Sequence, residues 1–276
     1  MNRFRKRVKL LSVSAKNLVG LDRQLSVVMI HPGRCGSTVL ANMLSVHKNI
    51  FWAAEVYEVI FAKLKKDGNT GDTFRTLITE PLQTVIQSRS RLAARIERVY
   101  GFEFKPFHTE LIDVPLDTFI DDLEREGFTH FIVLDRKNRL RKICSALIAA
   151  KTGQYSYSLE ENVKKTSVRI EVGAVQLEYT CKPLIDFLKG YDQHFSKLEV
   201  SLENRKTLKL FYEDDIEHDP IRAYKKICKF VGLEPLRNVN VRNKRINPHP
   251  LSTMIENYEE VQEYLRGSAF EWMLET

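Results

Sequence analysis

Cysteine is scarce in this chain of 276 residues, and no two cysteines form a C-x-x-C pair. The four cysteines are Cys35, Cys144, Cys181 and Cys228. This spacing excludes a disulfide framework and a cysteine-based zinc site, and it favours a reducing compartment. The sequence also lacks an apolar run of the roughly 20 residues that span a bilayer. The basic first residues lack the apolar core and cleavage site of a secretory signal, so we expect a cytoplasmic protein.

Acidic residues are absent from the first nine positions, which hold Arg3, Arg5, Lys6, Arg7 and Lys9. Removing these five charges from the formal net charge of +7 leaves only +2 for the rest of the chain. That excess is too small for a general nucleic-acid-binding surface, so any anion site must be local. Residues 1–20 are expected to form a solvated basic leader. The alternative is a short amphipathic helix that makes a weak, peripheral contact with a membrane surface.

Repeats, low-complexity tracts and Gly/Ser linkers are absent as well, so residues 21–276 are predicted to form a single domain. Apolar patterns predict strands at 25–30, 101–108, 130–135 and 207–212. They predict helices at 37–46, 55–66, 117–126, 138–150 and 219–232, and a further helix that begins at 251. Helical patterns also run from the end of a turn-rich segment at 67–72 up to residue 100.

The alternation of short buried strands with helices favours a three-layer α/β fold, in which helices flank a central parallel sheet. Residues 154–179 interrupt this alternation because they are rich in Tyr, Ser and Thr. We expect this excursion on the carboxyl side of the sheet, where α/β proteins form their binding sites.

A glycine-containing turn, His31-Pro-Gly-Arg-Cys-Gly-Ser-Thr38, links the first strand to the first helix. Such a turn can bind an anion through backbone N–H groups and the helix dipole. It does not match the loop that binds nucleoside triphosphates, because that loop has four residues between its glycines and a lysine after the second. Here two residues separate Gly33 and Gly36, and Ser37 follows.

Two further basic segments follow along the chain. The first surrounds a helix start after the 130–135 strand and contains Arg136, Lys137, Arg139, Arg141 and Lys142. Arg141 and Ser145 share a face of this helix because they are four residues apart; Arg139 and Lys142 are expected on its solvated face. The second segment is the acid-free loop 237–249, whose cations include Arg242, Lys244 and Arg245.

Together these segments resemble the sulfotransferase family that uses 3′-phosphoadenylyl sulfate. Arg34-Cys-Gly-Ser-Thr38 matches the family's 5′-phosphosulfate motif, R-x-G-[ST]-T, and Arg136-Lys-Asn138 with Ser145 matches its 3′-phosphate motif. The likeness covers residues 25–274 and is greatest to bacterial carbohydrate enzymes of the Nod-factor and trehalose type and to tyrosylprotein-type members. It implies a P-loop-like fold and a donor site formed by Arg34, Cys35, Gly36, Ser37, Thr38, Arg136, Lys137, Ser145, Arg242, Lys244 and Arg245.

The sequence departs from the family's motifs at two places. Arg-Lys stands where related enzymes have Arg-Arg, so either Arg136 or Lys137 is expected to hold the 3′-phosphate. Cys35 replaces the usual serine, and a thiol is a weaker hydrogen-bond donor than a hydroxyl. We expect Cys35 to contribute only its backbone N–H group.

The resemblance also implies a mechanism without a metal ion. Arg34 is expected to neutralise the leaving phosphate, and Lys105 is the candidate for a second cation. Glu55 is the favoured general base because it follows Arg34 at the spacing of tyrosylprotein-type enzymes, and His108 is the rival base. Glu58 is expected to be a surface acid, and the other histidines are expected at edges or on the surface.

The expected acceptor is a hydroxyl group of a carbohydrate or glycolipid, on which Phe51, Trp52, Tyr155 and Tyr157 could stack. The sequence makes no prediction of oligomeric state. One alternative is a small-molecule kinase of the P-loop type, which the missing lysine and the lack of an obvious strand-end aspartate for magnesium oppose. The other is a non-enzymatic module that binds a membrane or an anionic glycan through residues 1–20.

Overall fold

The structure is a computed structural model of the whole chain. It describes residues 25–55, 57–58, 99–111, 114–155, 165–177, 180–241, 243 and 248–275. The predicted leader, most of the helical region expected before residue 99, and the three loop cations Arg242, Lys244 and Arg245 lie outside these described residues.

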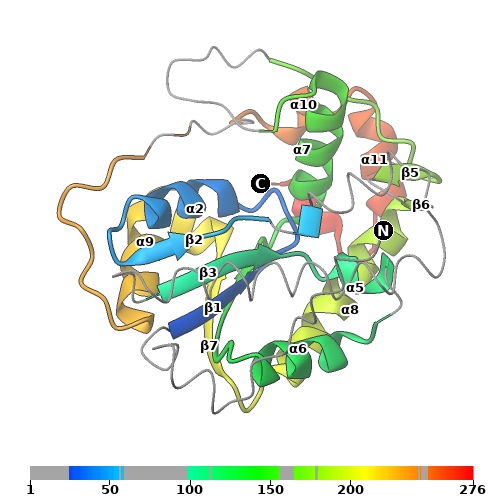
Figure 1. Ribbon diagram of the computed structural model, residues 1–276. Helices are drawn as coiled ribbons and strands as arrows, with labels where there is room; N and C mark the ends of the chain where they lie inside the picture. Colours follow the sequence, from blue (N-terminus) through cyan, green and yellow to red (C-terminus); the bar gives the residue numbers. More distant parts are fainter. Residues whose placement is uncertain are drawn as a thin grey trace, which may run out of the picture.

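A five-stranded sheet forms the centre of the molecule, with strand order β2-β3-β1-β4-β7 (Figure 1). Its strands are β1 (Leu25–Ile30), β2 (Ile50–Trp52), β3 (Val99–Phe104), β4 (His130–Asp135) and β7 (Lys206–Phe211). All four strand pairs are parallel, so every strand ends at the same edge of the sheet. This confirms the predicted α/β class with a parallel central sheet.

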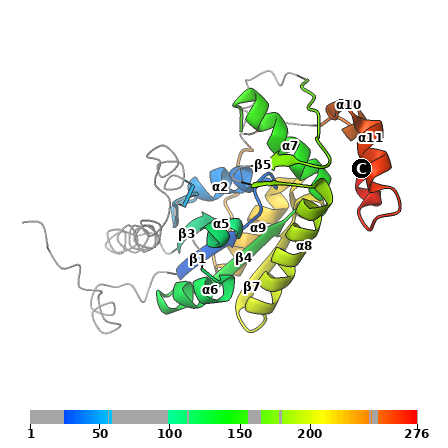
Figure 2. The same cartoon turned by 90° about the vertical axis from the view of Figure 1, so that its right-hand side faces the viewer.

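Helices cover both faces of this sheet, which gives the three predicted layers. One face packs against α2 (Ser37–Ser45) and α9 (Pro220–Phe230). The other packs against α6 (Leu116–Arg125) and α8 (Leu184–Ser201), which lie on the viewer's side of the sheet in Figure 2. Successive residues of β1 enter opposite cores because side chains alternate along a strand: Val27 and Met29 face α2, and Val28 and Ile30 face the other layer.

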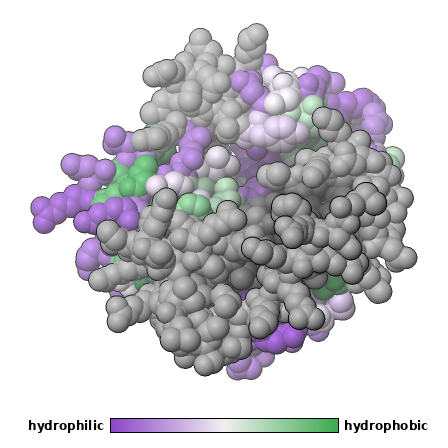
Figure 3. All heavy atoms as spheres, viewed as in Figure 1, coloured by the Kyte–Doolittle hydropathy of each residue, from purple (hydrophilic) through white to green (hydrophobic). Residues whose placement is uncertain are grey.

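A third apolar cluster forms around α7 (Arg139–Thr152), which follows β4 directly. Packed against it are an antiparallel hairpin, β5 (Val175–Leu177) with β6 (Thr180–Lys182), and the terminal elements α10 (Leu251–Met254), α11 (Tyr258–Leu265) and η3 (Glu271–Leu274). The described surface in Figure 3 is mostly hydrophilic. No helix in the described residues is long and apolar enough to cross a membrane.

The predicted strand at 101–108 is wrong at its carboxyl end. β3 ends at Phe104, and residues Phe107–Leu111 form the short helix α5. Pro106 explains the early end, because proline has no N–H group to donate to a strand ladder. His108 therefore lies on a helix rather than on a strand.

β2 and α8 are among the elements that the sequence analysis does not predict. β2 has only three residues, and its Trp52 ring lies directly against Gly101 of β3, where an added Cβ atom would be 2.1 Å from the ring. The helical spacing of Leu184, Phe187 and Leu188 is a readable signal for α8. Residues 37–45 and 116–125 are helical much as predicted, and Asp219 caps α9 by accepting from Ile221.

Candidate functional site

The turn after β1 has an unusual backbone that opens directly into α2. Gly33, Arg34 and Gly36 all have positive φ angles, of 75°, 56° and 85°. A Cβ atom on Gly36 would lie 2.9 Å from Ile216, so the turn requires glycine there. Among the described residues, no side chain caps the amino end of α2, and its first turn holds no acid. Its N–H groups and the helix dipole thus favour an anion at the amino end of this helix.

Arg34 is the second residue of this turn in a left-handed conformation, and its side chain reaches across to α7. Its Nε donates to the Ser145 hydroxyl (3.1 Å), and its Nη1 donates to the Tyr155 carbonyl oxygen (2.7 Å). No ion pair of Arg34 occurs within the described residues. Burial lowers the pKa of Arg34, and the nearby Arg136 lowers it further. An arginine in this position is stabilised by an incoming anion.

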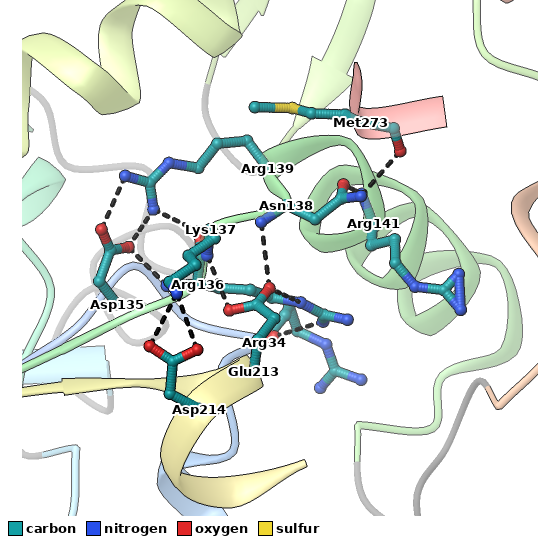
Figure 4. Close-up of polar contacts among 10 residues, drawn as sticks. All are labelled: Arg34, Asp135, Arg136, Lys137, Asn138, Arg139, Arg141, Glu213, Asp214 and Met273. Atoms are coloured by element: carbon teal, nitrogen blue, oxygen red, sulfur yellow. Dashed lines mark hydrogen bonds and ion pairs between the residues drawn. The ribbon is translucent and has the colours of Figure 1, made fainter. Parts of the chain in front are cut away.

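Arg136 supports the turn from the other side. Its Nη1 donates to the Arg34 carbonyl oxygen (2.8 Å), and its guanidinium lies 4.4 Å from the centre of the Tyr212 ring. In Figure 4 the guanidinium groups of Arg34 and Arg136 lie together, whereas Lys137 reaches the other way, toward Asp214. Lys137 is 46% exposed. Of the two candidate residues for the 3′-phosphate, Arg136 thus lies on the side of Arg34.

The amino end of α7 is capped by two polar side chains. The Asn138 Oδ1 accepts from the Arg141 amide (2.8 Å), and its Nδ2 donates to the Met273 carbonyl oxygen (2.7 Å). The Glu213 carboxylate accepts from the amides of Lys137 and Asn138. Glu213 therefore occupies the place that an anion takes at a helix start. A phosphate near α7 must instead bind through side chains such as Ser145.

The expectation that Arg139 and Lys142 face solvent is wrong, because both are buried. Arg139 binds both carboxylate oxygens of Asp135, and Lys142 contacts the Tyr191 hydroxyl and ring. Asp135 is nevertheless an aspartate at a strand end, because it is the last residue of β4. Its pairing with Arg139 leaves it poorly suited to bind magnesium.

Arg141 connects α7 to the loop that precedes α10. Its Nη1 and Nη2 both donate to the His249 carbonyl oxygen, at 3.2 and 2.8 Å. The basic loop 237–249 is therefore anchored beside the face of α7 that carries Ser145, although its three candidate donor ligands lie outside the described residues.

A second group of charged residues lies beside the turn, and we call it the carboxylate group: Glu55, Glu58, Lys105 and His108. Lys105 lies 3.0 Å from a Glu55 oxygen and 2.8 Å from a Glu58 oxygen. Nε2 of His108 lies 3.3 Å from the same Glu58 oxygen. A Cβ atom on Gly33 would be 3.7 Å from the Lys105 side chain, so this group borders the turn. The predicted residues Glu55, Lys105 and His108 thus come together.

Within the carboxylate group, Glu58 and His108 differ from their expected positions. Glu58 is not an isolated surface acid, because it contacts both Lys105 and His108. The hydrogen bond with His108 and the charge of Lys105 outweigh burial and lower the pKa of Glu58 to about 2. The His108 ring is 1% exposed, against 31% for Glu55, and burial lowers its pKa despite the Glu58 contact. Glu55 is therefore more open to a substrate than His108 is.

His31 belongs to a buried chain of polar contacts with Glu103 and Trp52, which contradicts the expectation that it is an edge residue. His31 is fully buried, as His47 and His130 nearly are. Its Nε2 lies 3.1 Å from one Glu103 oxygen, and the other Glu103 oxygen accepts from Trp52 Nε1 (2.9 Å). Burial raises the pKa of Glu103, but His31 and Trp52 prevail and lower it. An acid inside an otherwise apolar strand was the signal for this site.

His31, Glu55 and Glu103 are also the described residues that come closest to a metal-binding set, with ligand-type atoms within 4.8 Å of one another. The surroundings suit an ion-pair network better. Lys105 already contacts Glu55, and the Gly33 amide donates to Nδ1 of His31 (3.1 Å). A ring that accepts at Nδ1 carries its proton on Nε2, where a metal would need a lone pair.

Backbone strain occurs in the turn that carries Arg34 and next to Glu55 of the carboxylate group. Arg34 and Ala54 are the residues other than glycine with positive φ in the described chain, and Ala54, at 54°, directly precedes Glu55. The Ala54 carbonyl oxygen accepts from the Glu103 amide (2.8 Å), which fixes the start of Glu55 against β3. A residue other than glycine keeps a positive φ only where the surrounding contacts hold it there, and such strain clusters at functional sites.

The other predicted site residues have mixed positions. Cys35 and Ser37 are buried, and Thr38 is exposed at the first turn of α2. Phe51 and Trp52 pack into the two cores rather than facing an acceptor. Tyr155 is 61% exposed and contacts Arg34 through its carbonyl oxygen, and Tyr157 lies outside the described residues.

Neither a protein-family model nor a curated protein matches the chain. Among solved structures, it is similar to the crystal structure of a sulfotransferase from Alicyclobacillus acidocaldarius, with a TM-score of 0.49 and 11% sequence identity. The similarity covers 91% of this chain and 96% of that chain.

Proposed function

We propose that this protein is a sulfotransferase that transfers the sulfuryl group of 3′-phosphoadenylyl sulfate to a hydroxyl group of a carbohydrate or glycoconjugate. The observation that carries the proposal is the contact between Arg34 Nε and the Ser145 hydroxyl (3.1 Å). It joins the two sequence motifs that resemble the family's phosphosulfate and 3′-phosphate motifs, although 111 residues separate them.

The charge distribution around Arg34 supports an anionic ligand with two phosphate positions. Arg34 and Arg136 approach each other, and burial together with the charge of Arg136 lowers the pKa of Arg34. The uncapped start of α2 lies directly after Arg34 and suits the 5′-phosphosulfate. Arg136 and Ser145 suit the 3′-phosphate, and we assign Arg136 rather than Lys137 because Lys137 reaches toward Asp214.

In this proposal the acceptor oxygen forms a bond to sulfur while the bond from sulfur to the bridging phosphate oxygen breaks. Adenosine 3′,5′-bisphosphate leaves, and the acceptor proton passes to Glu55. Arg34 and the first N–H groups of α2 stabilise the charge that grows on the leaving phosphate. Glu55 is assigned as the base because it is more exposed than His108, which lies behind Glu58. Lys105 lies beside Glu55 and Gly33 and is the second cation for the transferring group.

Nucleotide binding tests the donor half of this proposal. Calorimetry should give much tighter binding of adenosine 3′,5′-bisphosphate than of AMP, because a charge-assisted contact to the extra phosphate contributes about 1.5–3 kcal/mol. Equal affinities would remove the argument for a 3′-phosphate site. An assay with labelled donor in the absence of magnesium, run beside one with ATP and magnesium, separates sulfuryl transfer from a kinase activity.

The acceptor half needs its own measurement. With donor present, a panel of free sugars, oligosaccharides, glycolipids, phenols and tyrosine peptides should yield sulfated product from the carbohydrate members. Product from the phenols or peptides alone would contradict the carbohydrate assignment and leave the sulfotransferase assignment intact. Salt-sensitive vesicle or glycan binding without nucleotide binding would favour the non-enzymatic alternative.

A further inference from the structure

We infer that His31 is a positioning residue for the turn that carries Arg34, and that Glu103 holds His31 in the tautomer required for this role. The inference rests on the proposed function only for its binding readout. The contacts themselves belong to the fold, and a spectroscopic measurement tests them without any ligand.

Four groups from three segments form one buried chain of contacts. Trp52 of β2 donates to Glu103 of β3 at 2.9 Å, and the second Glu103 oxygen lies 3.1 Å from Nε2 of His31. His31 directly follows β1, and its Nδ1 accepts from the Gly33 amide at 3.1 Å. His31 is fully buried and Glu103 nearly so, which makes a wrongly placed proton costly.

The two ends of the imidazole ring are assigned by their partners. A backbone amide can only donate, so Nδ1 must accept and carries no proton. A neutral ring then has its proton on Nε2, which lies 3.1 Å from an oxygen of the Glu103 carboxylate. Glu103 thus stabilises the one neutral tautomer that can bind Gly33.

The contact with Gly33 matters because the turn is strained. Gly33 and Arg34 both have positive φ, and this region is costly for a residue with a side chain. Two contacts hold the turn from opposite sides: Nδ1 of His31 binds the Gly33 amide, and Arg136 binds the Arg34 carbonyl oxygen. Loss of the first frees the turn on its β1 side and lets the Arg34 guanidinium move.

A charged ring is the competing state. Burial lowers the pKa of His31, but Cys35 and Glu103 outweigh burial and raise it. An imidazolium carries a proton on Nδ1 as well and could not accept from Gly33. The charged state and the proposed tautomer therefore make opposite predictions for the protonation of Nδ1.

Nitrogen-15 NMR of the full chain, labelled at histidine, distinguishes these states at pH 7. We expect a His31 signal with a protonated Nε2 and an unprotonated Nδ1, identified by its loss in His31→Asn. A protonated Nδ1, in either the charged ring or the other tautomer, would overturn the inference. Glu103→Gln supplies the matched perturbation. The side-chain amide that it introduces donates to Nε2 of His31, so the proton of the ring should move to Nδ1. An unchanged tautomer in that variant would show that Glu103 does not set it.

Two substitutions of His31 then separate its two contacts. Asparagine places an oxygen near the position of Nδ1 and can accept from Gly33, whereas glutamine reaches the position of Nε2 and can contact only Glu103. By calorimetry, His31→Asn should bind adenosine 3′,5′-bisphosphate at least about tenfold more tightly than His31→Gln, since an unsatisfied buried donor is costly. Equal affinities would overturn the positioning role. If His31→Gln does not fold by circular dichroism, Glu103→Gln takes its place, with the same tenfold loss relative to His31→Asn expected.

The proposed function can fail separately. If the unaltered protein binds no bisphosphate, the donor assignment is wrong, and the NMR signals of His31 and the Gly33 amide still test the positioning role. If the protein binds bisphosphate but Nδ1 is protonated, only the inference about His31 is wrong.

Discussion

The arginines around the turn and the carboxylate group beside it differ in how their charges are balanced. Arg34 makes no ion pair among the described residues and bonds to a hydroxyl and a carbonyl oxygen instead. Lys105, whose side chain borders Gly33 of the same turn, contacts two carboxylates. A cation without a counter-ion is available to bind an anion, whereas a paired lysine holds its carboxylates in place. The arginine side should therefore meet the donor's charge, including the charge that grows on the leaving phosphate, and the carboxylate side should govern proton transfer.

The largest effect should come from the carboxylate group. Glu55→Gln should lower turnover by about 10²–10⁴-fold and leave donor affinity nearly unchanged, because the variant loses only general-base catalysis. The acidic limb of the pH–rate profile should disappear with it. His108→Asn is the matched control and should lower turnover far less. A nearly normal Glu55→Gln enzyme beside an inactive His108→Asn enzyme would transfer the base to His108.

The next largest effect should come from the arginine side, where Arg34 should affect turnover more than donor affinity. Arg34→Ala should lower turnover by about 10²–10³-fold, because the phosphate charge that Arg34 meets grows in the transition state. Donor binding, measured by calorimetry, should weaken only modestly. Arg34→Lys keeps the charge and should recover part of the rate. A variant that loses affinity but keeps its turnover would restrict Arg34 to ground-state binding.

A smaller effect should distinguish the two neighbouring cations at the start of α7. Arg136→Gln should weaken bisphosphate binding about tenfold or more and lower the free energy of unfolding by about 1–3 kcal/mol, since it removes a buried contact to the Arg34 carbonyl oxygen. Lys137→Gln should change the unfolding free energy by less than about 0.5 kcal/mol, because Lys137 is half exposed. The reverse order in chemical denaturation and calorimetry would assign the 3′-phosphate to Lys137.

The smallest effect concerns stability in acid. Because the pKa of Glu58 is lowered to about 2 in the folded chain, this carboxylate stabilises the fold above its ordinary pKa near 4.5. That contribution should be lost as the pH falls from about 4.5 to 2. Since Glu58 is more than one-third exposed, we expect a contribution of no more than about 1 kcal/mol. Unfolding curves of the wild type and Glu58→Gln should converge in this window, and parallel curves would contradict the assignment.

Much of the fold could be predicted because its signals are local. The strands at 25–30 and 130–135 and the helix from residue 37 depend on apolar runs and glycines that neighbouring residues supply. The sequence does not predict β2, because three residues are too few to show the alternation of a strand. Their place is set by the packing of Trp52 on Gly101. The end of β3 was misjudged although Pro106 marks it.

The candidate site divides in the same way. The sequence by itself determined the residue types and their order: a glycine turn with Arg34, a later cluster of cations with Ser145, and the candidates Glu55, Lys105 and His108. Only the tertiary structure decided which charges are buried and with which partners. The parallel sheet brings the ends of β1, β3 and β4 to one edge, so that Arg34 meets Ser145 and His31 meets Glu103. Burial and pairing depend on residues far apart in the chain, and no local pattern specifies them.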